Sequence, residues 1–202
     1  MMKTITKVYG FTLVEIIVGI VVLSIALMGG LSLLISQVDT FKDPLIREKS
    51  AQISKRIIHE IQIRSFDEKS DIGGGLFRCG ETVSGVSLGE CTPLQDYGPD
   101  SSEKVIVSLN DVDDFDTRKL CSRLTESYAC TNDYMPVVYF FSDAADAAQQ
   151  QKYNDYYADF AVKIEVSPLK IDSNGFSGKL ITVTVKQSDG YEVDYSFVKA
   201  NI

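Results

Sequence analysis

Residues 110 to 116, NDVDDFD, gather four carboxylates on a short stretch of chain: Asp111, Asp113, Asp114 and Asp116. Carboxylate oxygens are ligands that Ca²⁺ prefers, so the stretch raises the hypothesis of a calcium site. It lacks the glycine and the distal glutamate of an EF-hand loop. We therefore favour a solvated turn over a metal site, and we expect the chain to need no cofactor.

The four cysteines are the next candidates for chemistry. No C-x-x-C pattern occurs and the only histidine, His59, lies elsewhere, which disfavours a zinc site. Disulfides are the better interpretation and agree with an exported domain. Four cysteines allow three connectivities, and the sequence alone does not choose among them. We favour the local pairs Cys79–Cys91 and Cys121–Cys130, because each closes a short polar loop that has little core to hold it.

Enzymes and nucleic-acid-binding proteins are the function classes that the sequence disfavours. His59 lies within RIIHEIQI, where we expect a surface or interface side chain, and no G-x-S-x-G, H-E-x-x-H or P-loop pattern occurs. The net charge of −8 and the lack of a Lys/Arg cluster oppose contact with phosphates. We expect neither catalysis nor a nucleic-acid partner.

The run from Ile16 to Ser36 contains 21 residues without a charge. As a helix it would be about 31 Å long, enough to cross a bilayer core. Lys3 and Lys7 precede it and the acidic residues follow it, so the positive-inside tendency places the N-terminus in the cytoplasm and the domain outside. A cleaved secretory signal is an alternative, although no A-x-A site follows the run. Neither that alternative nor a plain anchor explains the single charge of Glu15.

Residues 39–68 predict an amphipathic continuation of this helix. Pro44 favours a kink, because it removes a backbone donor. We expect the helix to stop before the glycines of SDIGGG, residues 70–75. One side of this helix is an apolar arc that is free to pack on a domain, and the charged side chains lie outside it. The arc consists of Ile46, Ile53, Ile57, Ile58 and Ile61.

Residues 70–133 are rich in Gly, Ser, Asp and Pro, and they contain all four cysteines. We expect loops there, interrupted by a short strand at Val105–Leu109. A second strand is expected at Met135–Phe141. The polar stretch that follows, residues 142–157, is compatible with either a loop or a short helix.

The clearest strand signal lies near the C-terminus, where apolar residues alternate with polar ones over three segments. A two-residue loop between the last two strands would pair Val185 with Asp194 and bring a charge to the core face. A three-residue loop, 188–190, pairs Val185 with Val193 instead and places Gly190 where a left-handed residue is needed. We predict an antiparallel sheet with one dry face against the isoleucine arc. Its inward residues are Phe160, Val162, Ile164, Val166, Ile181, Val183, Val185, Tyr191, Val193, Tyr195 and Phe197.

The stretch GFTLVE, Gly10 to Glu15, follows a short Lys-containing leader and precedes about 20 apolar residues. This arrangement resembles the processing site of the type IV prepilins. The resemblance implies cleavage after Gly10 by a prepilin peptidase on the cytoplasmic side, and N-methylation of the new N-terminus, Phe11. A lone carboxylate in lipid needs a partner. We expect Glu15 to pair with the amino group of Phe11 on an adjacent subunit and so to set axial register.

Shorter blocks resemble the minor pilins of the mannose-sensitive haemagglutinin (MSHA) pilus system: FDEKSD (66–71), RCGE (78–81), CT (91–92), GPD (98–100), NDVDDF (110–115) and the C-terminal hairpin. The resemblance implies a structural subunit that waits in the inner membrane with its domain in the periplasm. Its partners would be other pilins and the inner-membrane assembly platform. It would help to initiate or cap a filament at the cell surface, where such filaments serve cell adhesion.

Two other functions stay open on the sequence. A minor pseudopilin of a type II secretion system shares the same N-terminal signal. An adhesive module, binding a surface glycan through residues 70–133, belongs to a different class.

The expected organisation is a type IV pilin-like α+β fold. Residues 1–10 form a leader that is removed, and residues 11–38 a transmembrane and assembly helix. Residues 39–68 continue that helix as an amphipathic segment, and residues 69–202 form a periplasmic β domain with disulfide-bearing loops.

Overall fold

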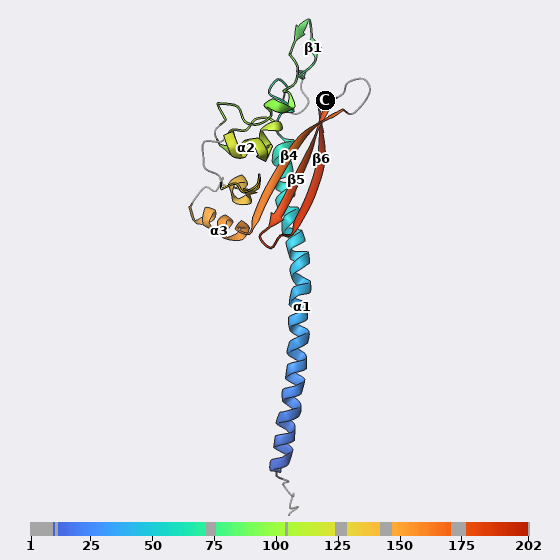
Figure 1. Cartoon of the computed structure of the whole chain (residues 1–202), viewed down its shortest axis with the longest axis vertical. Helices are drawn as coiled ribbons and strands as arrows, with labels where there is room; N and C mark the ends of the chain where they lie inside the picture. The colour runs from blue at the N-terminus through green and yellow to red at the C-terminus, as the bar shows by residue number, and fades with distance from the viewer. Residues whose placement is uncertain are drawn as a thin grey trace, which may run out of the picture. The chain divides into compact units, whose positions relative to one another are not determined.

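One helix, α1 (Leu13–Gln62), passes through both units into which the chain divides, Met1–Glu48 and Lys49–Ile202 (Figure 1). The computed structural model describes residues 10, 12–71, 76–103, 105–123, 129–141, 147–170 and 177–201, with the backbone only for residues 33–43, 147 and 177. The helix is continuous through Pro44. It ends at Gln62, earlier than the expected bound at residue 68.

In the first unit, the described side chains of α1 form no core. The large apolar ones from Leu13 to Leu31 are 53–74% exposed. The hydroxyl of Ser24 donates a hydrogen bond to the carbonyl of Ile20 (2.7 Å), and that of Ser32 donates to the carbonyl of Met28 (3.0 Å). Since lipid offers no hydrogen bonds, polar groups there must be satisfied within the segment. This part of α1 meets that requirement and presents an apolar surface all round.

The second unit is built on an antiparallel sheet of four strands in the order β3-β4-β5-β6. These strands are β3 (Met135–Pro136), β4 (Phe160–Lys170), β5 (Ser177–Gln187) and β6 (Glu192–Ala200). The inward residues expected on β4 and β5 are all at most 4% exposed. Those expected from Tyr191 to Phe197 are half-buried, because β6 is an edge strand.

The hairpin between β5 and β6 has the predicted three-residue loop. Val185 pairs with Val193, Val183 with Tyr195 and Ile181 with Phe197. The N–H of Gly190 donates to the carbonyl of Gln187 (3.0 Å), and Gly190 has a φ of +95°, in the left-handed region that glycine tolerates. The parity of the apolar pattern therefore determines the register, as predicted.

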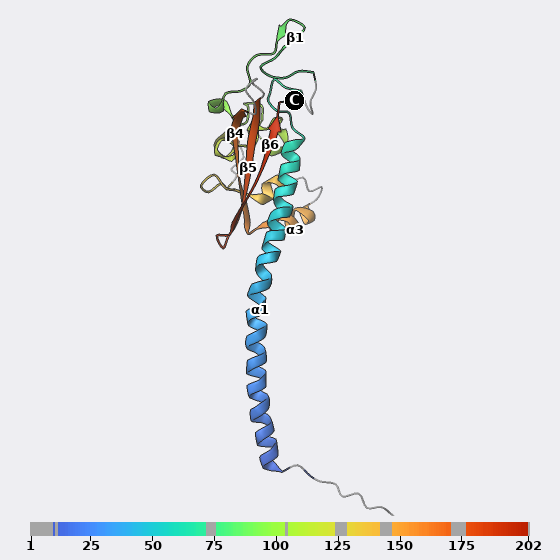
Figure 2. The same ribbon diagram turned by 90° about the vertical axis from the view of Figure 1, so that its right-hand side faces the viewer.

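The core forms where the C-terminal part of α1 meets the inward face of the sheet, side by side in Figures 1 and 2. Ile53, Ile57 and Ile61 are at most 1% exposed. Ile58 is half-buried against the same core, and Ile46 is half-buried. The isoleucine arc thus supplies one side of the core and the sheet the other, which gives the α+β type IV pilin-like fold.

The segments between helix and sheet are mostly short turns and helices. They comprise β1 (Thr82–Val83), β2 (Val86–Ser87), η1 (Leu94–Asp96), η2 (Ile106–Ser108), η3 (Asp113–Phe115), α2 (Thr117–Arg123), η4 (Val137–Phe141) and α3 (Ala147–Tyr157). The strand expected at Val105–Leu109 is wrong, because Ile106–Ser108 form a 3₁₀ turn in which Ile106 and Leu109 both face the core. The strand expected at Met135–Phe141 is only two residues long and then turns into η4.

The end of α1 is held by the last strand. The ammonium of Lys199 on β6 donates to the carbonyl of Gln62 (2.9 Å) and also to that of Arg64. Such contacts satisfy carbonyls that a helix end leaves without partners. Ser65 then pairs with the segment before η3, its N–H donating to the carbonyl of Asn110 (3.2 Å). The chain that follows the helix therefore lies beside the acidic stretch, residues 110–116.

We expect Ile57→Ala to lower the free energy of unfolding of the domain by about 2–5 kcal/mol, because it leaves a cavity between α1 and the sheet. Ile63→Ala is the matched control, since Ile63 is 49% exposed just beyond the helix, and it should cost less than about 0.5 kcal/mol. Urea unfolding of the full chain in detergent, followed by tyrosine fluorescence in this tryptophan-free protein, measures both. Equal losses for the two variants would contradict the proposed role of the arc.

Candidate functional site

The N-terminal motif forms the start of α1. Thr12 stands just before the first helical residue, and the N–H of Glu15 donates to the Thr12 hydroxyl (3.3 Å) and carbonyl (3.1 Å). Thr12 is therefore the N-cap and Glu15 the third helical residue, the arrangement of a T-x-x-E capping box. The T-x-x-E spacing of Thr12 and Glu15 is the sequence signal from which this cap is predictable.

The helix end also favours the charge of Glu15. A carboxylate in the first turn is stabilised by the partial positive charge of the helix N-terminus. Glu15 is exposed, so its carboxylate is free to reach a group outside this chain. Gly10 is exposed as well, and a Cβ added there would meet nothing within 4 Å. Phe11 lies outside the described residues.

Within the described part of the chain, one helix is long and apolar enough to cross a membrane. It is Leu13–Ser32, 20 residues with a mean hydropathy of 2.5 and none of them buried. Together with the motif that precedes it, this segment indicates membrane anchoring.

The family described as "Prokaryotic N-terminal methylation motif" matches residues 5–31, which include Gly10, Phe11 and Glu15. No curated protein matches the chain. No solved structure matches it either. The match covers the prepilin-type signal, and the domain that follows has the α+β fold with disulfides. Signal and fold together support a protein of the type IV pilin or pseudopilin class, which is structural rather than enzymatic.

A second cluster of functional groups lies inside the domain, at the acidic stretch. Asp111, Asp113, Asp114 and Asp116 are each at most 3% exposed. The solvated turn expected from the sequence is therefore wrong. The density of charge in this stretch favoured solvated side chains. However, the neighbouring residues Val112 and Phe115 are fully buried, and the aspartates between and beside them are therefore buried as well.

Backbone N–H groups donate hydrogen bonds to these buried carboxylates. Asp111 Oδ1 accepts from the N–H of Asp113 (3.0 Å) and of Asp114 (3.3 Å). Asp114 Oδ2 accepts from the N–H of Asn110 and of Asp111, both at 3.1 Å. Short-range bonds of this kind are what aspartate uses to stabilise turns. Burial is tolerated because the oxygens keep hydrogen-bond donors.

The cation in this cluster is Lys179 of β5, which is 2% exposed. Its ammonium contacts the carboxylate of Asp113, and it lies 3.5 Å from Asp67 Oδ2. It also donates to the carbonyl of Phe66 (2.6 Å). Three acceptors satisfy the three protons of the ammonium. Lys179 precedes Ile181 by two positions, so the period of two would have predicted that it faces the core.

Asp116 has a different partner and a different task. Its carboxylate binds the guanidinium of Arg118 and accepts from the N–H of Val166 on β4 (3.4 Å). The hydroxyl of Thr117 bonds to the backbone of Ile164 in both directions, at 3.1 and 3.2 Å. These contacts fasten α2 to β4. A calcium ion would have to compete with protein donors for one oxygen of each of Asp111, Asp113 and Asp114 and for both oxygens of Asp116, and the calcium hypothesis stays a prediction.

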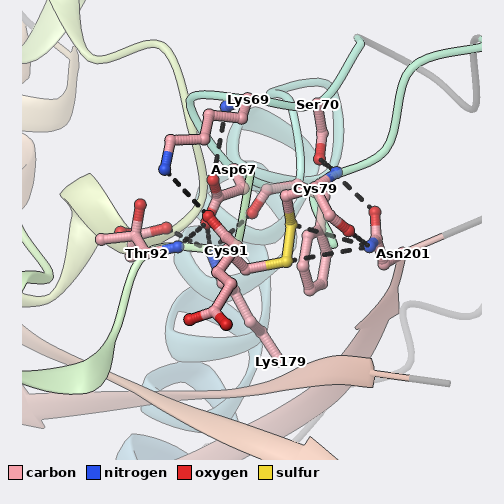
Figure 3. Close-up of a disulfide and its surroundings, with 11 residues drawn as sticks. Asp67, Lys69, Ser70, Cys79, Cys91, Thr92, Lys179 and Asn201 are labelled. Carbon is pink, nitrogen blue, oxygen red and sulfur yellow. Dashed lines mark hydrogen bonds and ion pairs between the residues drawn. A yellow bond between two sulfur atoms is a disulfide. The ribbon is translucent and has the colours of Figure 1, made fainter. Parts of the chain in front are cut away.

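The two disulfides join the pairs that the sequence favoured, Cys79–Cys91 and Cys121–Cys130. Figure 3 shows the first of them beside Asp67, whose Oδ2 accepts from the N–H of Thr92 (2.8 Å). The sulfurs of this pair and a carboxylate oxygen of Asp67 lie within 4.8 Å of one another. A zinc ion could not use them, since the sulfurs are bonded to each other.

Burial raises the pKa of the Asp111 carboxyl to about 9, and the charges of Asp113 and Asp114 act in the same direction. Burial likewise raises the pKa of Asp114 to about 7. It also raises the pKa of Asp113, against the opposing effect of Lys179. At neutral pH Asp111 therefore keeps its proton.

The raised pKa of Asp111 makes stability depend on pH. An unfolded aspartate ionises near pH 4, whereas folded Asp111 keeps its proton up to about pH 9. The contribution of this group is complete below about pH 4 and is lost as the pH rises through about 9. Between about pH 7 and about pH 9 we expect the free energy of unfolding to fall by on the order of 1 kcal/mol per pH unit.

Asp111→Asn keeps the Oδ1 acceptor and removes the titration, so it should flatten this slope. Asp96→Asn is the matched control, because Asp96 is exposed on η1 and should leave the slope unchanged. Urea unfolding at a series of pH values measures all three proteins. An unchanged slope in Asp111→Asn would contradict the assignment.

Proposed function

We propose that this chain is a minor pilin of an MSHA-like type IV pilus, most similar to the minor pilin MshD, and that it helps to initiate or cap the filament. The observation that carries the proposal is Glu15, one exposed carboxylate at the start of an otherwise apolar, fully exposed helical segment. A prepilin-type methylation motif covers the same residues.

The exposed segment of α1 needs two successive environments. Before assembly the bilayer covers its apolar side chains, because leaving them in water would be strongly unfavourable. In a filament the helices of other subunits replace the lipid. The backbone and the Ser24 and Ser32 hydroxyls are already satisfied within the helix, so neither environment has to supply hydrogen bonds.

Glu15 distinguishes filament assembly from simple anchoring. Cleavage after Gly10 creates a free amino group on Phe11, four residues from Glu15 in the sequence. The carboxylate of one subunit then pairs with the amino group of the next. An ion pair surrounded by apolar helices is sensitive to displacement, because a carboxylate left alone there is costly. The pair therefore selects one axial register.

A minor pseudopilin of a type II secretion system is the second candidate, because the matched motif is common to both classes. Tagging the full chain and identifying the pilins that co-purify after cross-linking would separate the two. Recovery of secretion pseudopilins alone would overturn the pilus assignment.

We expect Glu15→Ala to leave membrane insertion intact and to reduce incorporation into filaments on the order of tenfold or more, the effect of losing about 1.4 kcal/mol per contact. Glu15→Gln, which keeps the size and loses the charge, should behave in the same way. Glu68→Gln, an exposed glutamate of the domain, is the matched control and should assemble normally. Immunoblots of sheared filaments measure incorporation, and immunoblots of membranes measure insertion. Normal incorporation of Glu15→Gln would refute the register role.

Processing has its own test. The mature protein should begin at N-methylated Phe11, and Gly10→Val should accumulate with the leader attached. A Cβ at Gly10 or at Gly19 meets no atom of the chain, so neither substitution disturbs the fold. Gly19→Ala is therefore the control and should be cleaved normally. Mass spectrometry of the N-terminal peptide reads the outcome, and a first residue other than Phe11 would refute the assigned site.

A further inference from the structure

The contact between Lys179 and Asp113 joins a primary amine to a carboxyl group inside the domain. The two side chains come from β5 and η3, far apart in the sequence, and are 2% and 3% exposed. Two aromatic rings close around the ammonium, with centroids 4.6 Å (Phe66) and 5.0 Å (Tyr97) from Nζ. Water is therefore kept from an amine and a carboxyl that touch each other.

In water such a pair is inert, because the amine is protonated and the carboxylate is a poor electrophile. Amide formation needs the neutral amine and the neutral acid, which differ from the ion pair by one proton transferred within the pair. Burial raises the pKa of the Asp113 carboxyl, which favours its neutral form, since burying charge is costly. The contact also holds the reacting groups together, which replaces a bimolecular encounter by an intramolecular one.

Asp111 supplies the remaining requirement, a proton donor beside the electrophile. Its Oδ1 accepts a hydrogen bond from the backbone N–H of Asp113 (3.0 Å), which places the Asp111 carboxyl beside Asp113. Burial raises the pKa of Asp111 to about 9, so the group is protonated at neutral pH. A protonated carboxyl in this position can polarise the Asp113 carbonyl and can pass a proton to the departing oxygen.

We propose that Lys179 and Asp113 join in an intramolecular amide bond, with Asp111 as the catalytic acid. Nζ of Lys179, as the neutral amine, attacks Cγ of Asp113, and the N–C bond forms. The bond between Cγ and the Asp113 hydroxyl breaks, and the hydroxyl leaves as water after taking one proton from Asp111, while the attacking nitrogen gives one of its two protons to Asp111 and so restores it. The ammonium and carboxylate become an amide and one water, with no change in oxidation state.

The arrangement selects Asp113 over the other carboxylate near Lys179. Asp67 Oδ2 lies 3.5 Å from Nζ and is already bound to the N–H of Thr92 at 2.8 Å (Figure 3). Asp67 has no described hydrogen bond to a protonated carboxyl. Among the described carboxylates, Asp113 alone both contacts the Lys179 amine and bonds to Asp111, through its own backbone N–H.

The bond is tested on the full chain, purified in detergent with its disulfides reduced. Its mass should be lower by one water than the mass of the sequence after processing. Trypsin should fail to cleave at Lys179, and peptides 105–118 and 171–186 should be recovered as one branched species. This branched species distinguishes the amide from dehydration within a single peptide. A join between 171–186 and 65–69 would overturn the choice of Asp113.

Two variants examine the roles of the residues. Asp113→Ala removes the electrophile, and Asp111→Asn keeps the Oδ1 acceptor while removing the acid, so both should have the full mass of their sequences. Lys186→Met is the control, because Lys186 is a half-buried lysine of the same strand that pairs with Glu192 and not with Asp113, and it should still lose one water. Full mass for the unaltered chain, with free peptides 171–179 and 180–186, would overturn the proposal. A coupled Asp111→Asn protein would overturn the role of Asp111.

Discussion

The burial of the isoleucine arc of α1 against the inward face of β4 and β5 is the contact on which the domain depends. Ile53, Ile57 and Ile61 are almost fully buried, and Val162, Ile164 and Val183 face them as part of the same core. A three- to four-residue spacing on the helix and a two-residue spacing on the strands bring both apolar sets to one surface. Every other element of the domain has to cover the borders of this core or close its ends.

The buried charges result from the way the chain after α1 and the segment around η3 cover one border of this core. The chain leaving α1 is held by Lys199 and pairs with residues next to η3, which brings Phe66 and Asp67 beside the aspartates. Lys179 lies on the inward face of β5, where an apolar residue would continue the pattern. A buried lysine there requires carboxylates, and the carboxylates in turn require it, since either would be costly alone. The cluster thus specifies how the loops meet the sheet.

The two ends of α1 have opposite relations to their surroundings. Toward its C-terminus the helix is one side of a core, whereas from Leu13 to Leu31 its apolar side chains are exposed. Thr12 caps this exposed end, and Glu15 lies in the first turn, where the helix itself favours a negative charge. A helix arranged in this way suits a subunit that passes from a bilayer to a bundle of like helices. The methylation motif at the same residues supports that class of protein.

The sequence by itself determined features that depend on local pattern. The span of the apolar helix, the isoleucine arc, the inward faces of β4 and β5 and the three-residue loop before β6 all follow from periodicity and parity, which act over a few residues. Tertiary structure decided the rest. Val105–Leu109 has the composition of a strand, yet no strand in the described part of the chain pairs with it and Ile106–Ser108 form a 3₁₀ turn. The aspartates from 111 to 116 have the composition of a solvated turn, yet they are buried. Their partners are Lys179, Arg118 and backbone groups of β4, and a short segment of sequence cannot show which distant donor will meet a carboxylate.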